Sequence, residues 1–104
     1  MLLHNVYFWL KADLSADQRA EFERELARLP AISYIADGFV GRPAATEQRA
    51  VTDHSFDYSL SLLFNSDADQ SFYQNECPEH ARFVERCSPF FARVLVYDSA
   101  PLGA

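Results

Sequence analysis

Leu2-Leu3-His4-Asn5-Val6-Tyr7-Phe8-Trp9-Leu10 is the stretch that decides the fold. It contains no Gly or Pro and is rich in aromatic and branched residues, which favour a β-strand. Side chains alternate between the two faces of a strand, which gives one set of His4, Val6, Phe8 and Leu10 and a second set of Leu3, Tyr7 and Trp9. Both sets are mostly apolar, so we expect this strand to be buried on both faces. One layer of helices covers only one face, and we expect a second subunit to cover the other.

The following 54 or so residues carry a helix pattern and two further strand patterns. Ser15 and Gln18 form a capping box that opens a helix, and Pro30 ends it after about Leu29. Residues 32–40 are expected to form a second strand, with Gly38 and Gly41 marking a bulge or the strand's exit. A long polar connection follows. Residues 56–64 alternate more cleanly than any other segment and predict a third strand.

The last third of the chain predicts a broken helix and a closing strand. Residues 65–67, Asn-Ser-Asp, offer N-cap residues for a helix that Pro78 interrupts and restarts. Residues 91–97 read as a strand that ends at Asp98, and the tail after Ser99 should fray. The order strand, helix, strand, strand, helix, strand predicts an α+β, ferredoxin-like βαββαβ fold with two helices on one face of an antiparallel sheet.

Length and composition limit the classes of protein that the chain can belong to. A chain of 104 residues is expected to form a single domain, residues 1–104, with one modest core. Nine Phe, five Tyr and one Trp are a heavy aromatic load for that core, which again predicts a homodimer. The net charge of −6, with Lys11 as the only lysine, argues against nucleic acid, which requires a clustered basic face.

The sequence gives no sign of a membrane span or a disulfide framework. Met1-Leu2-Leu3 meets His4 and Asn5 at once, and no apolar run approaches the roughly 18 residues of a membrane helix. We therefore expect a soluble, cytoplasmic protein. Cys77 and Cys87 are too few for a secreted disulfide framework and lack the second pair that a zinc site needs, so we expect both to be reduced.

Residues 73–80, Tyr-Gln-Asn-Glu-Cys-Pro-Glu-His, gather the side chains most able to perform chemistry. Pro78 suits the first position of a helix, which places His80 in the first turn, where the helix dipole favours a neutral, base-competent ring. The flanking Glu76 and Glu79 act in the opposite direction, because negative charge stabilises imidazolium. The alternative is an ordinary surface histidine beside a helix cap.

A set of residues from His4 to about Ser99 has a characteristic order and spacing. The set consists of His4 and Lys11, residues 41–44 (Gly-Arg-Pro-Ala), Val51, Asp53, residues 55–60, Phe64, Tyr73-Gln74, Pro78, His80, Phe83 and residues 93–99. Together these residues resemble the stress-responsive dimeric α/β-barrel (Dabb) family. It implies that two protomers pair their sheets face to face to enclose a barrel. Some plant members resemble polyketide cyclases, which use a His and Tyr pair in a pocket between helices and sheet.

The chain departs from the family pattern at two places. Many members carry a Tyr-Gln-x-x-Pro-x-His segment, whereas Glu76-Cys77 makes this segment one residue longer and puts Cys77 where a histidine often stands. The tyrosine that the cyclases place in the first helix aligns with Leu26, which cannot donate a proton.

Three functions remain open from the sequence, and whether the protein is an enzyme is left undecided. The first is a non-catalytic homodimer that binds a small apolar ligand or acts in stress response. The second is an acid/base enzyme of lyase or polyketide-cyclase type, in which His80 is the base, Tyr73 donates a hydrogen bond, His4 orients the ligand, and Phe8, Phe22 and Phe83 shape the pocket. The third is a cofactor-free monooxygenase-like enzyme that uses Tyr7 and Trp9.

No cofactor or metal ion is expected. His4 and His80 with Asp98 or Glu76 are conceivable ligands, but the sequence has no ligand spacing such as His-x-x-x-His. His54 falls in the polar connection and is expected to be solvated. A helix start can lower the pKa of a thiol such as Cys77, which the flanking Glu76 and Glu79 oppose.

Overall fold

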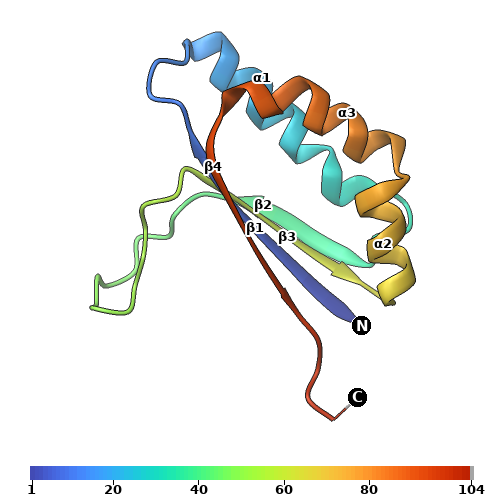
Figure 1. Cartoon of the computed structure of the whole chain (residues 1–104). Coiled ribbons are helices and arrows are strands. Elements are labelled where there is room, and N and C mark those ends of the chain that lie inside the picture. The colour runs from blue at the N-terminus through green and yellow to red at the C-terminus, as the bar shows by residue number, and fades with distance from the viewer. Residues whose placement is uncertain (104) are drawn as a thin grey trace.

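The computed structural model describes residues 1–103 and shows a four-stranded antiparallel sheet with helices on one face (Figure 1). The elements follow in the order β1 (Leu2–Leu10), α1 (Ala16–Ala27), β2 (Asp37–Gly41), β3 (Tyr58–Phe64), α2 (Asp67–Asn75), α3 (Pro78–Cys87) and β4 (Phe91–Ser99). Short 3₁₀ turns at Leu29–Ala31 and Ser88–Phe90 precede β2 and β4. The strands lie in the order β2-β3-β1-β4, so β1 is central. The predicted ferredoxin-like α+β fold is confirmed.

The helix boundaries follow from local signals in the sequence. The side chain of Ser15 accepts a hydrogen bond from the Gln18 backbone N–H at 3.1 Å, and the Gln18 side chain accepts one from the Ser15 N–H at 2.8 Å. This capping box begins α1, as predicted. Pro78 is the first residue of α3, where its missing N–H breaks no helical hydrogen bond. The predicted interruption and restart of the second helical region is therefore confirmed.

The second strand is shorter than predicted, because residues 32–35 form a turn and pairing with β3 begins only with the Ala36 N–H, which donates to the Leu63 carbonyl. The Ile32 N–H donates to the Leu29 carbonyl and the Ile35 N–H donates to the Ile32 carbonyl, so the chain turns there. Strand β2 covers only Asp37–Gly41. Gly38 lies inside it in regular register rather than at a bulge, and a Cβ at this position would lie 2.5 Å from the Ser61 carbonyl oxygen.

Three other predicted boundaries move by one or more residues. Helix α1 ends at Ala27 rather than near Leu29, since residues 29–31 tighten into a 3₁₀ turn at Pro30. Strand β3 begins at Tyr58 rather than at residue 56. Strand β4 continues to Ser99, because its pairing with β1 extends to Leu3.

The two faces of the sheet differ in what covers them. The helices bury the face that carries His4, Val6, Phe8 and Leu10, together with the inward residues of β3 (Figure 1). The opposite face carries apolar side chains that no element of residues 1–103 buries, among them Leu3, which is 39% exposed, and Tyr97, which is 60% exposed. Strand β1 is thus apolar on both faces but buried on one within a protomer.

Within residues 1–103, no helix has the length and apolar character needed to cross a membrane.

Candidate functional site

His4 lies on the inward face of β1 and pairs with Asp98 on the neighbouring strand. The two residues are directly opposite each other in the β1–β4 register, and His4 Nδ1 lies 2.5 Å from Asp98 Oδ1. His4 is only 4% exposed, whereas Asp98 is exposed at the sheet edge. An ionised carboxylate only accepts hydrogen bonds, so Nδ1 of His4 carries the proton. Asp98 therefore fixes both the orientation of the ring and the position of its proton.

Tyr73 of α2 packs between the two histidines of the site. Its ring centroid is 5.9 Å from that of His4 and 4.5 Å from that of His80. Tyr73 is 1% exposed, and burial, followed by the nearby Cys77, raises the pKa of its hydroxyl far above the ordinary value. The hydroxyl therefore stays protonated at physiological pH and can act as a hydrogen-bond donor.

His80 sits in the first turn of α3, as its position after Pro78 predicted. Burial lowers the pKa of its imidazole, and the neighbouring His4 lowers it further. The effect of desolvation on the His80 pKa thus outweighs that of the exposed carboxylates of Glu76 and Glu79, which were expected to raise it. The ring is neutral at pH 7 and has a lone pair available to take a proton.

A groove of about 500 Å³ at the junction of α2 and α3 brings solvent to His80 but not to its two partners. Its lining residues come from two segments, 74–77 and 80–81, together with Val84 and Glu85. His80 is the only one of the three predicted polar site residues that lines it, because Tyr73 and His4 lie deeper. His80 therefore lies at the groove, Tyr73 lies behind it, and His4 lies beyond Tyr73 and pairs with Asp98 at the exposed sheet edge.

The extra residue before Pro78 does not separate Tyr73 from His80. Both the Glu76 and Cys77 backbone N–H groups donate to the Phe72 carbonyl, which closes the end of α2 with one tight turn. Cys77 is the N-cap residue of α3 and is buried, and its Sγ lies 3.7 Å from Glu79 Oε1. The longer segment is absorbed in this turn, so the two rings still meet.

Phe8, Phe22 and Phe83, the residues predicted to shape a ligand pocket, pack against one another in the core. Their ring centroids are 5.4 to 5.9 Å apart, and each ring also contacts Phe91. None of the three lines any of the three clearest cavities in residues 1–103. In this structure they fill the space between the sheet and the helices.

The residues required by the oxygenase alternative lie on the other face of the sheet. Tyr7 and Trp9 line a cavity of about 370 Å³ there, away from His80. Trp9 is already engaged, since its Nε1–H donates to Ser55 Oγ at 3.1 Å and the Arg93 guanidinium lies 4.5 Å from its ring centroid. His54, which lines the same cavity, is half-buried and pairs with Thr46 at 3.0 Å.

Two functional or structural pairings were missed by sequence reasoning. Asp98 was considered only as a metal ligand, whereas the structure makes it the partner of His4; the strand register, which the sequence does not display, is the signal that would have shown it. Glu25 of α1 is buried and bonded to Arg82 of α3.

Among residues 1–103, no group of three His, Cys, Asp or Glu side chains is arranged to hold a metal ion.

Comparison with known proteins gives a consistent picture. The model of the Stress responsive A/B Barrel Domain family matches residues 2–101. A ferredoxin-like Dabb protein from Mesorhizobium loti is 25% identical, with a TM-score of 0.73, and the match covers 98% of this chain and 97% of that one. A search of the curated proteins found no match.

Two more distant structures share the fold. The hydroxynitrile lyase from Passiflora edulis is 20% identical, with a TM-score of 0.76, over 99% of this chain and 94% of that one. A dimeric ferredoxin-like protein of unknown function from Thermobifida fusca is 18% identical, with a TM-score of 0.75, over 96% and 90% of the two chains.

Proposed function

The chain belongs to the stress-responsive A/B barrel domain family, and from this premise we propose that it is a homodimeric acid/base enzyme of lyase or cyclase type. The observation that carries the proposal is a cluster of three rings. The ring centroid of neutral His80 lies 4.5 Å from that of Tyr73, and the Tyr73 centroid lies 5.9 Å from that of His4, whose ring Asp98 orients. A base, a donor and an oriented polar group within one small volume are the parts that proton-transfer chemistry requires.

Each side chain has a distinct part in this proposal. His80 takes a proton from a hydroxyl or an acidic carbon of the substrate, because its lowered pKa keeps the ring neutral at pH 7. The Tyr73 hydroxyl, whose raised pKa keeps it protonated, donates to the oxygen on which negative charge develops in a substrate that enters past His80, because Tyr73 itself lies below the groove. His4 is a positioning residue, held by Asp98. Assistance of this kind is worth about 10² to 10⁴-fold in rate.

The proposed substrate is small, and the reaction is a bond cleavage or ring closure next to a carbonyl or hydroxyl. One structural neighbour is a hydroxynitrile lyase. At 20% identity this supports the reaction class only by analogy of fold. The groove at His80 has a volume within the range of small-molecule sites, about 300 to 1,000 Å³.

The homodimer is proposed from the outer face of the sheet. Leu3 and Tyr97 are exposed there beside the half-buried Tyr7, Trp9 and Leu95, and large apolar patches of this kind mark interaction surfaces. Structural neighbours of the same fold are dimeric. A second copy that packs its own outer face against this one would bury β1 on both sides.

A non-catalytic ligand-binding or stress-stability protein is the second candidate. It is favoured by the packing of Phe8, Phe22 and Phe83, which fills the interior, and by Leu26, which stands where the cyclases place a tyrosine and can donate no proton. In this alternative the three neighbouring rings of His80, Tyr73 and His4 have no catalytic role and only stabilise the fold.

The test is turnover of small cyanohydrins and of short β-polyketide thioesters, followed by NMR. His80→Ala and Tyr73→Phe are expected to lower the rate by 10² to 10⁴-fold, while gel filtration shows an unchanged dimer. His54→Gln is the matched control, because His54 is a half-buried histidine that lines the outer-face cavity. Unchanged turnover in His80→Ala overturns the enzyme proposal, and saturable binding with no turnover in the wild-type protein supports the second candidate.

A further inference from the structure

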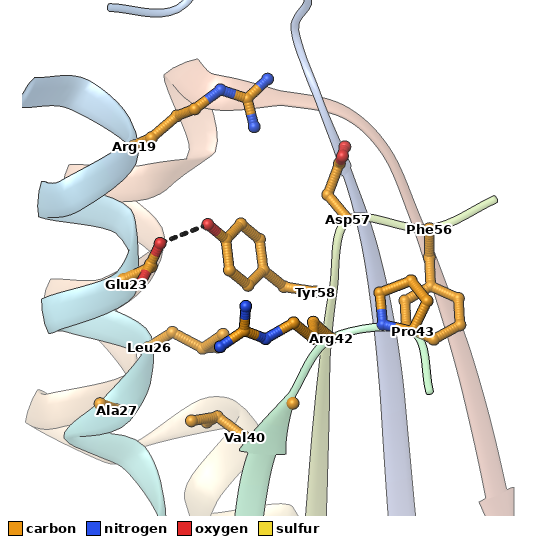
Figure 2. Close-up of a pocket in the computed structure, with 11 residues that line it drawn as sticks. Arg19, Glu23, Leu26, Ala27, Val40, Arg42, Pro43, Phe56, Asp57 and Tyr58 are labelled. Carbon is orange, nitrogen blue, oxygen red and sulfur yellow. Dashed lines mark hydrogen bonds between the residues drawn. The ribbon is translucent and has the colours of Figure 1, made fainter. Parts of the chain in front are cut away.

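The structure contains two grooves of similar volume, and they differ in the charges that line them. One, of about 520 Å³, lies between α1 and the β2–β3 edge (Figure 2). Its lining includes two arginines, Arg19 and Arg42, and two carboxylates, Glu23 and Asp57, so its charges balance. The other is the groove of about 500 Å³ at His80, whose lining residues include two carboxylates but no arginine or lysine of residues 1–103.

The two carboxylates of the groove at His80 come from its two walls. Residues 80, 81, 84 and 85 of α3 lie on one face of the helix, and this face ends in Glu85. The end of α2 provides the amides of Gln74 and Asn75, followed by Glu76. We call Glu76 and Glu85 the groove carboxylates. Both are exposed, and neither forms a salt bridge within residues 1–103, so both are ionised at neutral pH.

The cations of α3 lie on the side of the helix that faces α1. Arg82 Nη2 lies 3.0 Å from Glu25 Oε1, and Arg86 Nη1 lies 3.7 Å from the same oxygen. Glu25 offsets one of these two positive charges, and the exposed carboxylate of Glu79 in the first turn of α3 offsets the other. These neighbours therefore leave the charge of the groove carboxylates uncompensated.

The helix ends at the groove add little net charge. Helix α3 begins at Pro78 and presents its positive end there, which amounts to about half an elementary charge. Helix α2 ends at Asn75, at the same junction, and presents a negative end of similar size. The two partial charges offset each other, and the ring of His80 is neutral because burial lowers its pKa. The groove carboxylates therefore set the sign of the potential that a ligand meets.

We propose that the groove carboxylates select the substrate by its charge, so that the groove favours a small carbonyl or hydroxyl compound with an ammonium group and rejects carboxylates and phosphates. This inference rests on the proposed function only in taking the groove at His80 as the substrate site. Two carboxylates about 7 Å from a ligand charge in water change the affinity by about 3- to 10-fold at low ionic strength. The change is favourable for a cation and unfavourable for an anion.

The probes are three benzyl alcohols that differ only in the para group, which is trimethylammonium, tert-butyl or carboxylate. The tert-butyl group has the shape of trimethylammonium without its charge. Dissociation constants come from NMR titrations of the full chain. We expect the ammonium probe to bind at least about 10-fold more tightly than the carboxylate probe at about 10 mM salt. Most of this difference should be lost at about 0.5 M salt, because salt screens exposed charges.

Substitutions of the groove carboxylates test their part directly. Glu76→Gln and Glu85→Gln should each lower the ratio of ammonium to carboxylate affinity by about 3- to 5-fold, and the double variant should bring it close to one. The affinity for the tert-butyl probe should stay unchanged. Glu47→Gln is the matched control, because it removes an exposed carboxylate of the β2–β3 connection that lines neither groove, and it should leave the ratio unchanged.

The place of binding is read from ¹H–¹⁵N NMR spectra of the wild-type protein. The ammonium probe should shift the backbone signals of residues 74–85 and leave those of residues 40–43 and 56–58 unchanged. Equal affinity for the charged probes, a ratio that survives in the double variant, shifts outside residues 74–85, or no binding of any probe would each overturn the inference. Charge selection without turnover overturns the enzyme proposal alone, whereas turnover without charge selection overturns this inference alone.

Discussion

His4 and Phe8 lie on the same face of the same strand, four residues apart, yet their surroundings differ in kind. Around Phe8, the rings of Phe22 from α1 and Phe83 from α3 meet it edge to face and that of Phe91 from β4 is tilted against it, and no polar atom takes part in these contacts. Around His4, the apolar ring of Phe64 is joined by side chains that can give or take a proton, namely Asp98, Tyr73 and, beyond Tyr73, His80. We call these two regions the aromatic end and the polar end of the interior.

Burial is nearly the same at the two ends, since His4 and Phe8 are almost completely covered. What differs is whether burial changes the protonation behaviour of the groups. At the aromatic end it provides only hydrophobic and packing stabilisation. At the polar end burial, which is partial at His80 and nearly complete at Tyr73, lowers the pKa of His80 and raises that of Tyr73, which makes one a neutral base and the other a persistent donor. The chemistry of this fold therefore depends on which side chains are buried, not on how deeply.

The largest effect is expected from a truncation at the aromatic end. Phe22 is fully buried and contacts Phe8, Phe83 and Phe91. Phe22→Ala should lower the free energy of unfolding by about 3–5 kcal/mol, because it removes apolar contact and leaves a cavity. Urea denaturation measures the loss. Phe72→Ala, at a ring that is 42% exposed, is the control and should cost less than half as much.

A similar loss in unfolding free energy for Phe22→Ala and Phe72→Ala would contradict the difference drawn between the two ends. It would mean that the aromatic end is not the packed core of the chain.

A smaller effect is expected at the ion pair that joins α1 to α3 above the aromatic end. Glu25 is buried and accepts hydrogen bonds from Arg82 at 3.0 and 3.2 Å, which hold the pKa of its carboxyl below 4.5. Glu25→Gln should therefore destabilise the protein at neutral pH, by less than Phe22→Ala does, since the charge is lost but the amide still fits.

The pH dependence of this ion pair has a definite sign. A carboxyl with a lowered folded-state pKa stabilises the protein above its unfolded-state pKa, and that stabilisation is lost as the pH falls through the folded-state value. The difference in unfolding free energy between the wild type and Glu25→Gln should thus shrink below pH 4.5. A difference that stays constant from pH 7 to pH 3 contradicts the assignment.

The smallest effect on stability, and a selective one, is expected from Asp98→Asn at the polar end. Asp98 is 44% exposed, so the loss in unfolding free energy should be at most about 1 kcal/mol. The neutral amide no longer requires a proton on His4 Nδ1, and the ¹⁵N chemical shifts of His4 should show a change in tautomer. Unchanged ¹⁵N shifts would show that Asp98 does not orient the ring.

Much of the fold is predictable from the sequence, because the signals are local and agree with one another. The alternation in residues 2–10, the Ser15 and Gln18 capping box and Pro78 each predict an element that the structure contains. Residues 32–40 were predicted to form one strand, but Ile32 and Ile35 bury their side chains in a turn that precedes β2. Apolar composition alone does not distinguish a strand from a buried turn.

The polar end was predicted only in part. His80 and Tyr73 are close in sequence, and their segment identified them, whereas the His4–Asp98 pair joins residues 94 positions apart and depends on the β1–β4 register. The direction of the His80 pKa shift also depends on burial, which the sequence does not state, and the flanking Glu76 and Glu79 suggested competing effects. The groove between α1 and the β2–β3 edge was missed because its walls come from three separate segments.

The most direct test of the central claim, that burial at the polar end makes His80 a neutral base beside Tyr73, is an NMR titration of the His80 Cε1–H signal in the wild-type protein. The assignment comes from the signal that disappears in His80→Gln. We predict a titration midpoint below the ordinary histidine pKa of 6.5, because desolvation and His4 both disfavour the imidazolium. A midpoint at or above 6.5 would contradict the account, since His80 would then be an ordinary solvated histidine.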